Sequence, residues 1–469
     1  MNLIRTIVAS GFLILTLSGI LSSCKRKDKI LTDSSAKIEF STDTVTFDTV
    51  FTSIGSTTKN FRIYNNQNQT IKISRISLGR GNQSSFRFNI DGYPGPVVTD
   101  VEILPKDSLW VFVEVTIDPN NLNNPLLVKD SLIFEVNGNR QDIKLVAVGQ
   151  DVHFINSKIV GTQNWINDKP YLIYNSMLVD SLATLTISEG VKVYCNPNTR
   201  IFCAGTLIIN GSQSNPVTIQ GDRLEFDYKE APGQWIGMYF LAGSKDNVIK
   251  NAIIKNAILG IQADTVFNSN YTLQLLNTQI KNMTYAGLYF QGAKVLAENC
   301  IVANCGEFLS ALTIGGNYEF THCTFANYYS NSTRNTPSVL MNNYYKDLAG
   351  NIILRSIEKA DFKNCIIYGS IEEEIGFDKS PNIALNYSFN NCLLKSVQNL
   401  EGNNNVRNSD PAFANSNPEE NNFNILENSA ARNIGNPNFI NFNTQNDIRG
   451  TLRPSPPTPP DVGAIQYKP

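Results

Sequence analysis

The sequence predicts an all-β fold in which a β-sandwich precedes a right-handed parallel β-helix. Short β-rich segments separated by turn residues fill residues 36–151, and a motif with a period of about 22 residues recurs in the second half of the chain. The length of 469 residues predicts two or three domains. Hydrophobic residues make up 42% of the chain and charged residues 17%, which excludes a disordered polyelectrolyte.

The charge balance and the histidine count argue against two classes of function. The formal net charge is -2, whereas a nucleic-acid-binding protein concentrates excess positive charge. The chain has 2 histidines, His153 and His322, which leaves little for a histidine-rich metal site or for histidine-based catalysis. We therefore expect no nucleic-acid partner and no cofactor. Adjacent carboxylates could hold Ca²⁺, but no fixed spacing supports such a site.

Residues 1–23 have the features of a secretory signal peptide. Arg5 supplies a basic start, and the apolar run from Ile7 to Leu21 is too short to span a bilayer comfortably. The segment ends in Leu21-Ser22-Ser23-Cys24, which resembles a bacterial lipobox. The resemblance implies cleavage before Cys24 and attachment of diacylglycerol to its sulfur. The alternative is an ordinary secretory signal with an incidental cysteine.

The lipobox resemblance implies a lipoprotein of the cell envelope that is held to the outer membrane through Cys24. Two or three acyl chains, at about 0.8 kcal/mol per buried CH₂, make a lasting anchor. Residues 24–35 then form a lipidated tether, and residues 25–29 are basic. Lipoproteins that some Gram-negative groups export to the cell surface carry acidic residues there. The sequence therefore leaves open whether the protein faces the periplasm or the outside.

Residues 36–151 contain about seven β-rich runs, as an immunoglobulin-like sandwich of about 100 residues requires. Runs such as Trp110–Val115 and Ser131–Val136 alternate apolar and polar residues, which predicts strands with one buried face. Asn137-Gly138 is a strong signal for a tight hairpin.

This part of the chain is similar to the Hydin-type family of Ig-like domains. The similarity rests on Phe47, Val50-Phe51, Gly55-Ser56 and the run Phe61–Asn66, and it closes on Ala147-Val148-Gly149. It implies a spacer or a protein-binding module, of which we expect the spacer. Residues 152–164 are predicted to be a linker.

Residues 165–400 contain the repeated motif, in which an Asn-type residue is followed by a small residue and, two positions later, by a large apolar one. The first residue is expected at a corner, where Asn tolerates the left-handed conformation and can bond its counterpart one coil away. The next two positions point inward and stack about 4.8 Å apart. The corner residues are Asn251, Asn277, Asn299, His322, Asn364 and Asn391.

The opening of this region resembles the first coils of pectin-lyase-like β-helices from extracytoplasmic bacterial proteins. The motifs concerned are Leu185–Tyr194, Ala204–Ser212 and Asn215–Ile219, and the resemblance extends from Trp165 to Leu394. It implies the fold and leaves the activity open, because the same scaffold serves lyases, hydrolases, epimerases, adhesins and inert stalks.

Residues 401–469 are expected to close the end of the coil stack, since an uncovered last coil invites aggregation. Three motifs, Asn428–Asn436, Asp447–Arg453 and Asp461–Tyr467, resemble the C-terminal signature of secreted β-helix proteins. Gln466 replaces the last acid of that signature, so we expect neither calcium binding nor catalysis here.

The chain has 8 cysteines, of which Cys24 is assigned to the lipid. Four others follow the corner residues and are expected to form a buried ladder of thiols, with disulfides between adjacent coils as the alternative. These four are Cys300, Cys323, Cys365 and Cys392. Cys195 and Cys203 are the most favourable pair for a disulfide. The absence of a Cys-x-x-Cys motif argues against a metal site.

An acidic insertion supplies the candidate catalytic and ligand-binding residues. Its carboxylates could act as an acid and base pair, and neighbouring rings could stack on a sugar. The alternative is a solvated insertion with Trp235 packed beneath it. The candidate acids are Asp222, Glu225, Asp227 and Glu230, and the candidate ligand-binding residues are Tyr228, Trp235, Glu372, Glu373 and Glu374. For the last three, a plain exposed loop is the alternative, and His322 is expected to be a turn residue.

Asp-Ser/Thr-apolar triplets resemble an O-glycosylation motif of one bacterial phylum, although transitions from polar chain into strands produce such triplets by chance. They begin at Asp43, Asp48, Asp107, Asp130, Asp180 and Asp264.

We expect a non-catalytic envelope protein that presents its β-helix to a glycan or to a protein. The alternative is a polysaccharide lyase or glycoside hydrolase that acts in a groove along the coils, with the four acids of the insertion as candidates. An inert stalk is the third reading. The sequence does not indicate the oligomeric state.

Overall fold

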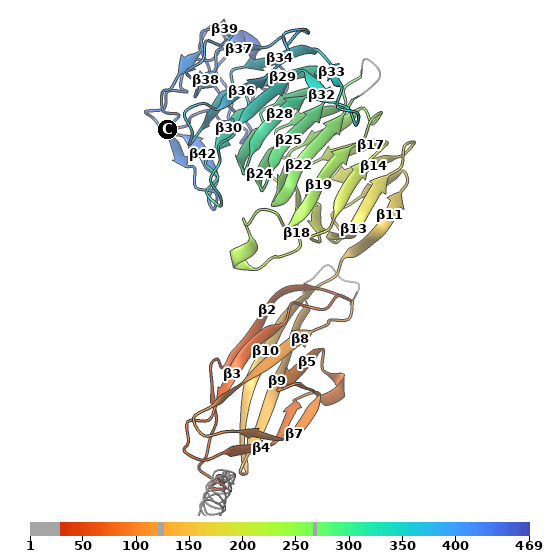
Figure 1. The fold of residues 1–469 in the computed structure, drawn as a ribbon, viewed down its shortest axis with the longest axis vertical. Coiled ribbons are helices and arrows are strands. Elements are labelled where there is room, and N and C mark those ends of the chain that lie inside the picture. Colours follow the sequence, from red (N-terminus) through yellow and green to blue (C-terminus); the bar gives the residue numbers. More distant parts are fainter. Residues whose placement is uncertain (1–28, 121–125, 266–269) are drawn as a thin grey trace, which may run out of the picture. The chain divides into compact units, whose positions relative to one another are not determined.

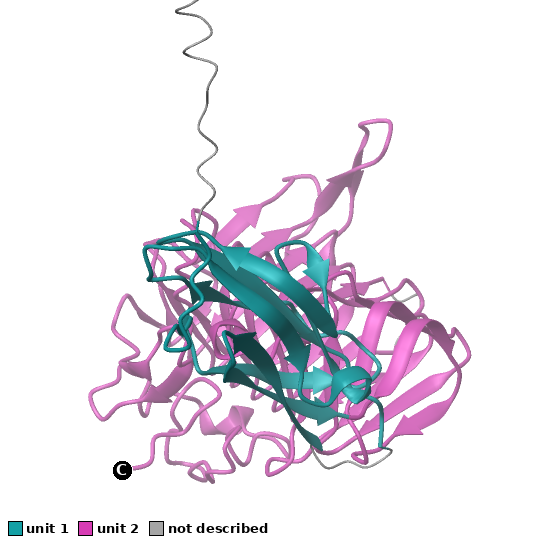
Figure 2. Ribbon diagram, turned by 90° about the horizontal axis from the view of Figure 1, so that it is seen from below, with its two compact units in different colours: residues 1–120, 124–150 teal, residues 121–123, 151–469 magenta. Residues whose placement is uncertain are grey.

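The computed structural model describes residues 29–120, 126–265 and 270–469, and these residues form strands and three short 3₁₀ helices (Figure 1). The 3₁₀ helices are Gly81–Gln83, Phe226–Tyr228 and Pro437–Phe439. Within these ranges no helix has the length and apolar character needed to cross a bilayer. The chain divides into a first unit that ends at Gln150 and a second unit that runs from Asp151 to Pro469 (Figure 2).

The first unit consists of two five-stranded sheets around one apolar core. One sheet has the order β1 (Glu39–Phe40), β3 (Lys59–Tyr64), β8 (Ser108–Val115), β5 (Phe86–Ile90), β6 (Tyr93–Pro94). The other has the order β2 (Thr44–Phe51), β10 (Asn139–Gln150), β9 (Leu126–Val136), β4 (Ile71–Leu78), β7 (Val97–Ile103). All neighbours are antiparallel except β2 and β10, which are parallel.

Two local features of the first unit follow from its sequence. Asn137 (φ 47°) and Gly138 (φ 82°) form the tight hairpin predicted between β9 and β10. Residues of the expected tether also belong to this unit, because Ile30 pairs with Thr70 and the amide of Asn137 donates to the carbonyl of Leu31. The expected tether therefore does not extend to residue 35 as free chain.

The second unit is a parallel β-helix with three sides, which we call A, B and C. Side A contains β15 (Lys192–Cys195), β18 (Val217–Gly221), β21 (Ala252–Lys255), β24 (Gln279–Met283), β27 (Ile301–Cys305), β30 (Thr324–Asn327), β35 (Ile366–Gly369), β38 (Leu393–Leu394) and β40 (Val406–Arg407). Side B contains β16 (Arg200–Cys203), β19 (Trp235–Phe240), β22 (Ala257–Asp264), β25 (Ala286–Gln291), β28 (Phe308–Thr313), β31 (Val339–Asn342) and β36 (Ile375–Asp378).

Side C contains β12 (Gln163–Trp165), β14 (Thr184–Ser188), β17 (Thr206–Asn210), β20 (Asn247–Lys250), β23 (Leu273–Leu276), β26 (Lys294–Glu298), β29 (Gly316–Thr321), β34 (Ile357–Lys363), β37 (Ser388–Asn390) and β39 (Gly402–Asn403). Two antiparallel hairpins stand outside the three sides, β32 (Tyr344–Lys346) with β33 (Ile352–Leu354) and β41 (Phe413–Asn415) with β42 (Asn422–Ile425).

The first rung of the β-helix lies where we expected a linker. The strand β11 (His153–Val160) pairs in parallel with β13 (Tyr171–Val179), and β12 pairs with β14 on side C. The prediction of a linker over residues 152–164 was therefore wrong. These residues lack the Asn corner motif by which the later coils were found, although their apolar positions face the same core.

The corner residues adopt the conformation that the repeat predicts. Each lies between a strand of side C and the following strand of side A, with φ between 50° and 55°. Asn reaches this left-handed region more easily than other residues with a side chain. Hydrogen bonds between successive corner side chains were predicted, and among the described residues one such pair has a contact of this kind. The amide of Asn364 lies 3.0 Å from the ring nitrogen of His322 in the preceding coil.

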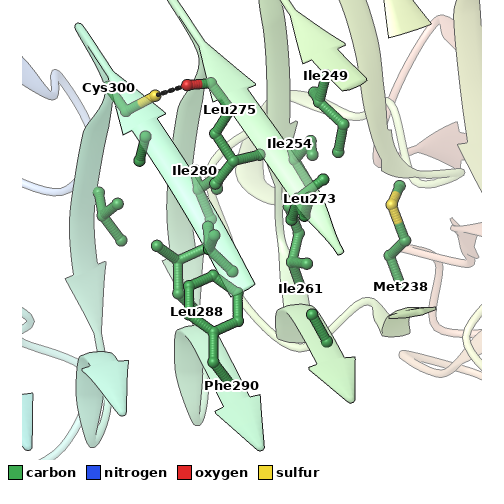
Figure 3. Packing of buried hydrophobic residues seen from close by; sticks show 14 of the residues in the cluster. Met238, Ile249, Ile254, Ile261, Leu273, Leu275, Ile280, Leu288, Phe290 and Cys300 are labelled. Carbon is green, nitrogen blue, oxygen red and sulfur yellow. Dashed lines mark hydrogen bonds between the residues drawn. The ribbon is translucent and has the colours of Figure 1, made fainter. Parts of the chain in front are cut away.

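The interior is filled by ladders of side chains from all three sides, part of which Figure 3 shows. The predicted thiol ladder is confirmed: each of its four thiols is at most 1% exposed and lies 3.4 to 3.5 Å from a carbonyl oxygen of the preceding coil. Beside it, the ring of Phe362 stacks on Phe320 at 4.7 Å and on Phe389 at 4.9 Å.

Cys195 and Cys203, the most favourable pair for a disulfide, are not bonded to each other, and all seven described cysteines are free and buried. Cys195 lies on side A and Cys203 on side B. Each cysteine is instead in strand register with residues of the neighbouring coils. For Cys195 these residues are Ile173 and Gly221. Burial raises the pKa of the Cys203 thiol to about 11.

Beyond Arg407 the C-terminal segment lies along the outer surface of side A, whereas we expected it to cover the end of the stack. Residues 402–407 still continue the coil as β39 and β40. The segment then packs apolar side chains, among them Phe423, Ile425, Ala464 and Ile465, on outward-facing residues of side A such as Ile301, Ala303 and Ile366. The amides of Asn299, Asn364 and Asn391 donate to its carbonyls at Asn446, Asn436 and Ile434.

Candidate functional site

The acidic insertion connects β18 on side A to β19 on side B and forms one wall of a cavity, which we call the acidic cavity. Its volume is about 440 Å³. Asp227 and Glu230 line it from the insertion, and Glu419 and Glu420 line it from the C-terminal segment. The sequence analysis missed these last two, because it expected the C-terminal segment at the end of the coils and not beside the insertion.

Glu230 is held by positive charge within the acidic cavity. Its carboxylate lies 2.8 Å from the ammonium of Lys255 and 3.3 Å from that of Lys281, and it accepts a hydrogen bond of 2.8 Å from the Asn282 amide. The three charged side chains are at most 15% exposed. Burial lowers the pKa of Lys281. This carboxylate is therefore committed to partners of the same chain and fixes the insertion to side A.

The other two candidate acids do not line the acidic cavity. Glu225 pairs with the guanidinium of Arg223 at 3.0 Å. Asp222 is partly buried and accepts a 3.0 Å hydrogen bond from the Asn196 amide. Burial raises the pKa of Asp222, which keeps a larger share of this carboxyl protonated than an exposed aspartate.

The two aromatic candidates of the insertion differ in exposure. Trp235 is 0% exposed and donates its ring N–H to the carbonyl of Lys255 at 2.9 Å. It packs beneath the insertion and cannot contact a ligand, so its assignment as a binding residue was wrong. Tyr228 is 39% exposed, with the guanidinium of Arg223 3.9 Å above its ring. Phe226, which lines the acidic cavity, is 88% exposed and was not predicted.

The three consecutive glutamates have separate environments. Glu374 is fully buried and forms a double contact with Arg334 at 2.7 and 2.8 Å, so it is a structural residue and not an exposed ligand contact. Glu373 accepts backbone N–H groups of Ile375 and Val397. Glu372 is exposed, as a plain loop residue would be.

Both histidines serve the fold. His322 occupies a corner with φ 52° and is 0% exposed, which confirms the turn prediction. Burial, together with the charge of Arg453, holds its pKa well below the usual range, so the ring stays neutral. His153 lies 2.9 Å from the carboxylate of Asp168 and stacks on Tyr171 at 4.6 Å.

Side B carries a row of partly exposed side chains on its outer surface, which we call the side B ladder. Strand pairing places its members in register on successive rungs. They are Leu178, Phe202, Tyr239, Gln262 and Tyr289. The rings of Phe202 and Tyr239 lie 5.5 Å apart. The sequence analysis assigned no role to these residues, because strand register is needed to bring them into one row.

An amide and a carboxylate accompany the side B ladder at the end of β22. The Gln262 amide donates to Asp264 at 3.0 Å and to the side-chain oxygen of Gln291 at 3.2 Å. Burial raises the pKa of Asp264. Polar groups that can both donate and accept therefore border the aromatic rings.

A basic hollow of about 450 Å³ lies at the start of the side B ladder. Leu178 and Phe202 belong to its lining, together with the cations Lys158 and Arg200, and no carboxylate of the described part of the chain lines it. Bulges in β11 and β13 shape one edge, where Asn175 has φ 61°. The hollow thus joins apolar surface to positive charge.

No three histidine, cysteine or acidic side chains group as metal ligands within residues 29–120, 126–265 and 270–469. Cys24, the expected site of lipid attachment, lies outside the described residues.

A family model described as a right handed beta helix region matches residues 184–327, from β14 to β30. The second unit is thus a right-handed parallel β-helix, as predicted. A comparison with curated proteins gives no match. A solved structure of a family 123 glycoside hydrolase from Clostridium perfringens aligns with 25% of this chain and 26% of its own, at 6% identity and a TM-score of 0.18. A similarity of this size has no bearing on fold or function.

Proposed function

We propose that this chain is a lipid-anchored protein of the cell envelope that binds a glycan along side B of its β-helix without cleaving it. The side B ladder carries the proposal. Aromatic rings offer flat apolar faces to the C–H faces of sugar rings, and neighbouring amides bond to hydroxyl groups. Rungs about 4.8 Å apart repeat these groups along a straight line, which suits an extended polymer.

The state of the candidate acids favours binding over catalysis. Glycoside hydrolysis requires two carboxyl groups that face one bond, one as the acid and one as base or nucleophile. Glu230 is bound by two lysines, and Glu225 is bound by Arg223. Neither is free to take up or deliver a proton at a substrate.

The alternative function is cleavage of a polysaccharide on side B, and Asp222 favours it. A carboxyl group whose pKa is raised by burial suits the role of general acid. Asp222 directly follows β18 of side A, and Asp264, at the end of the side B strand β22, also has a pKa that burial raises. This alternative requires both groups to reach one sugar chain.

A binding assay and a cleavage assay on the full chain distinguish the two functions. Tyr239→Ala and Tyr289→Ala should each weaken retardation in gels that contain a polysaccharide, by about tenfold in Kd, whereas the exposed control Phe442→Ala should not. The cleavage assay follows reducing ends or unsaturated uronides. Release of either product that is lost in Asp222→Asn would replace binding by catalysis as the function.

The anchor is tested separately. Labelling cells with a radioactive fatty acid should mark the wild-type chain and leave Cys24→Ser unmarked. An unmarked wild-type chain would remove the membrane attachment from the proposal and leave the glycan site untouched.

A further inference from the structure

We propose that the first unit is itself a binding module, whose β1-β3-β8-β5-β6 sheet holds an acidic polysaccharide on its outer face. This site is independent of the side B ladder and lies on the unit for which we expected the role of a spacer. The inference rests on two exposed aromatic residues of the central strand β8 and on the cation beside them.

The two aromatic side chains point to solvent from a strand whose alternate residues fill the core. Trp110 is 44% exposed and Phe112 is 41% exposed, whereas Val111 and Val113 are 0% exposed. Two positions apart on one strand, the rings are separated by about 6.8 Å. A strand that only had to pack on its core would carry polar residues at these positions.

Polar side chains of the neighbouring strands surround the rings. In strand register, Asn60 of β3 and Asn89 of β5 flank Phe112, and Arg62 of β3 lies opposite Trp110. The strands β3, β8 and β5 are hydrogen-bonded neighbours in this order. The arrangement offers the apolar ring of Phe112 next to the Trp110 ring that Arg62 covers, with donors and acceptors at their edges, which is the chemistry that a sugar ring presents in complementary form.

The positive charge of Arg62 favours a negatively charged ligand. Its guanidinium stacks 4.0 Å above the Trp110 ring and forms no ion pair with any carboxylate of the described residues. A guanidinium beside a ring still has N–H groups that can bind a carboxylate or sulfate group through two parallel hydrogen bonds. Arg87 of β5 adds no free charge, because it lies opposite Glu114 in strand register and its guanidinium donates to the carbonyls of Ser84 and Phe86. The acidic ligand is therefore inferred from Arg62 alone.

The size of the face argues for a thin polymer and against a stable protein partner. A specific protein interface uses about 20–30 residues on each side. The three strands β3, β8 and β5 present only a few outward side chains, of which Trp110 and Phe112 are the large apolar ones. A polysaccharide chain needs only such a narrow strip.

Tryptophan fluorescence of the full chain tests the proposal. The other two tryptophans, Trp165 and Trp235, are 3% and 0% exposed, so quenching by acrylamide reports mainly on Trp110. Polygalacturonate and dextran sulfate supply the two acidic groups, and uncharged dextran supplies neither. We expect at least one of the acidic polymers to halve the quenching, dextran to leave it unchanged, and Arg62→Ala to weaken the protection about tenfold.

Three comparisons decide the outcome. Tyr239→Ala, which affects the side B ladder, should leave the protection of Trp110 intact, so failure at one site does not imply failure at the other. Leu127→Ala, on the exposed surface of the other sheet, is the matched control and should change nothing. No protection by either acidic polymer, or equal protection by dextran, would overturn the proposal, and the first result would leave a protein as the partner of this face.

Discussion

Replacing Glu374 by Gln tests the buried ion pair that anchors the loop between β35 and β36. The side chains of Arg334 and Glu374 are 1% and 0% exposed, and the Glu374 carboxylate also accepts the backbone N–H groups of Ser338 at 3.2 Å and Ile371 at 3.1 Å. The substitution keeps the shape but leaves the guanidinium buried without its counter-charge. Breaking such a pair costs about 3–5 kcal/mol of the free energy of unfolding.

The measurement is urea unfolding followed by circular dichroism. Because the chain has two units, two transitions are expected, and the loss should fall on the transition of the second unit. Glu372→Gln, at the exposed neighbouring position, is the control and should change stability by less than about 0.5 kcal/mol. Adding Arg334→Met to Glu374→Gln should recover part of the loss, since no charge then remains unpaired. Equal effects of the two single glutamate substitutions would show that the ion pair does not hold this loop.

Three further predictions concern the coils. In a folded Cys24→Ser variant the described thiols should not react with a thiol reagent until urea is added, because burial holds the pKa of Cys300, Cys323 and Cys365 well above the usual range; prompt reaction would contradict their burial. Folding lowers the pKa of His322, so as the pH falls the unfolded state takes up a proton that the folded state does not. The free energy of unfolding should therefore fall by about 1.4 kcal/mol per pH unit below about pH 6.5. His322→Asn should lack this part of the slope in urea titrations, and an unchanged slope would refute the assignment. Asn277 has φ 50°, so Asn277→Ala should cost about 1–2 kcal/mol while Asn277→Gly should cost much less; the reverse order in urea unfolding would exclude a left-handed corner.

The coils were predictable because each position of the repeat has one local cause. A corner in the left-handed region favours Asn, and alternation in a strand places the following thiol and aliphatic side chains inward. Cys323 and Asn364 needed no knowledge of distant contacts. Predicting the C-terminal cover on side A did need knowledge of distant contacts. The sequence nevertheless carried a signal for it, because the outward-facing positions Ile301 and Ile366 are large and apolar, and both are buried in the structure.

The candidate site was less predictable, because its groups come from segments that only the coil stacking brings together. Lys255 and Lys281 are partners in strand register on β21 and β24, and the insertion folds Glu230 onto both. The predicted corners Asn251 and Asn277 already imply this register, because each lysine follows its corner by four residues. What the sequence did not indicate is that Glu230 folds onto both lysines. Nothing in the insertion itself indicates that Glu419 and Glu420 line the same cavity. A loop has no repeating sequence pattern from which its distant contacts could be predicted.

The C-terminal cover distinguishes the outer surface of side A from that of side B. Sides A and B both carry outward apolar rows, and large exposed apolar surface is a liability for a soluble domain. The chain covers the row on side A with Phe423 and Ile465 and fixes that cover through buried corner amides such as Asn299. Phe202 and Tyr239 on side B remain partly exposed. A long segment of the chain covers the row on side A, whereas no comparable cover lies on side B among the described residues. This difference is why we propose side B, and not side A, as the ligand-binding face.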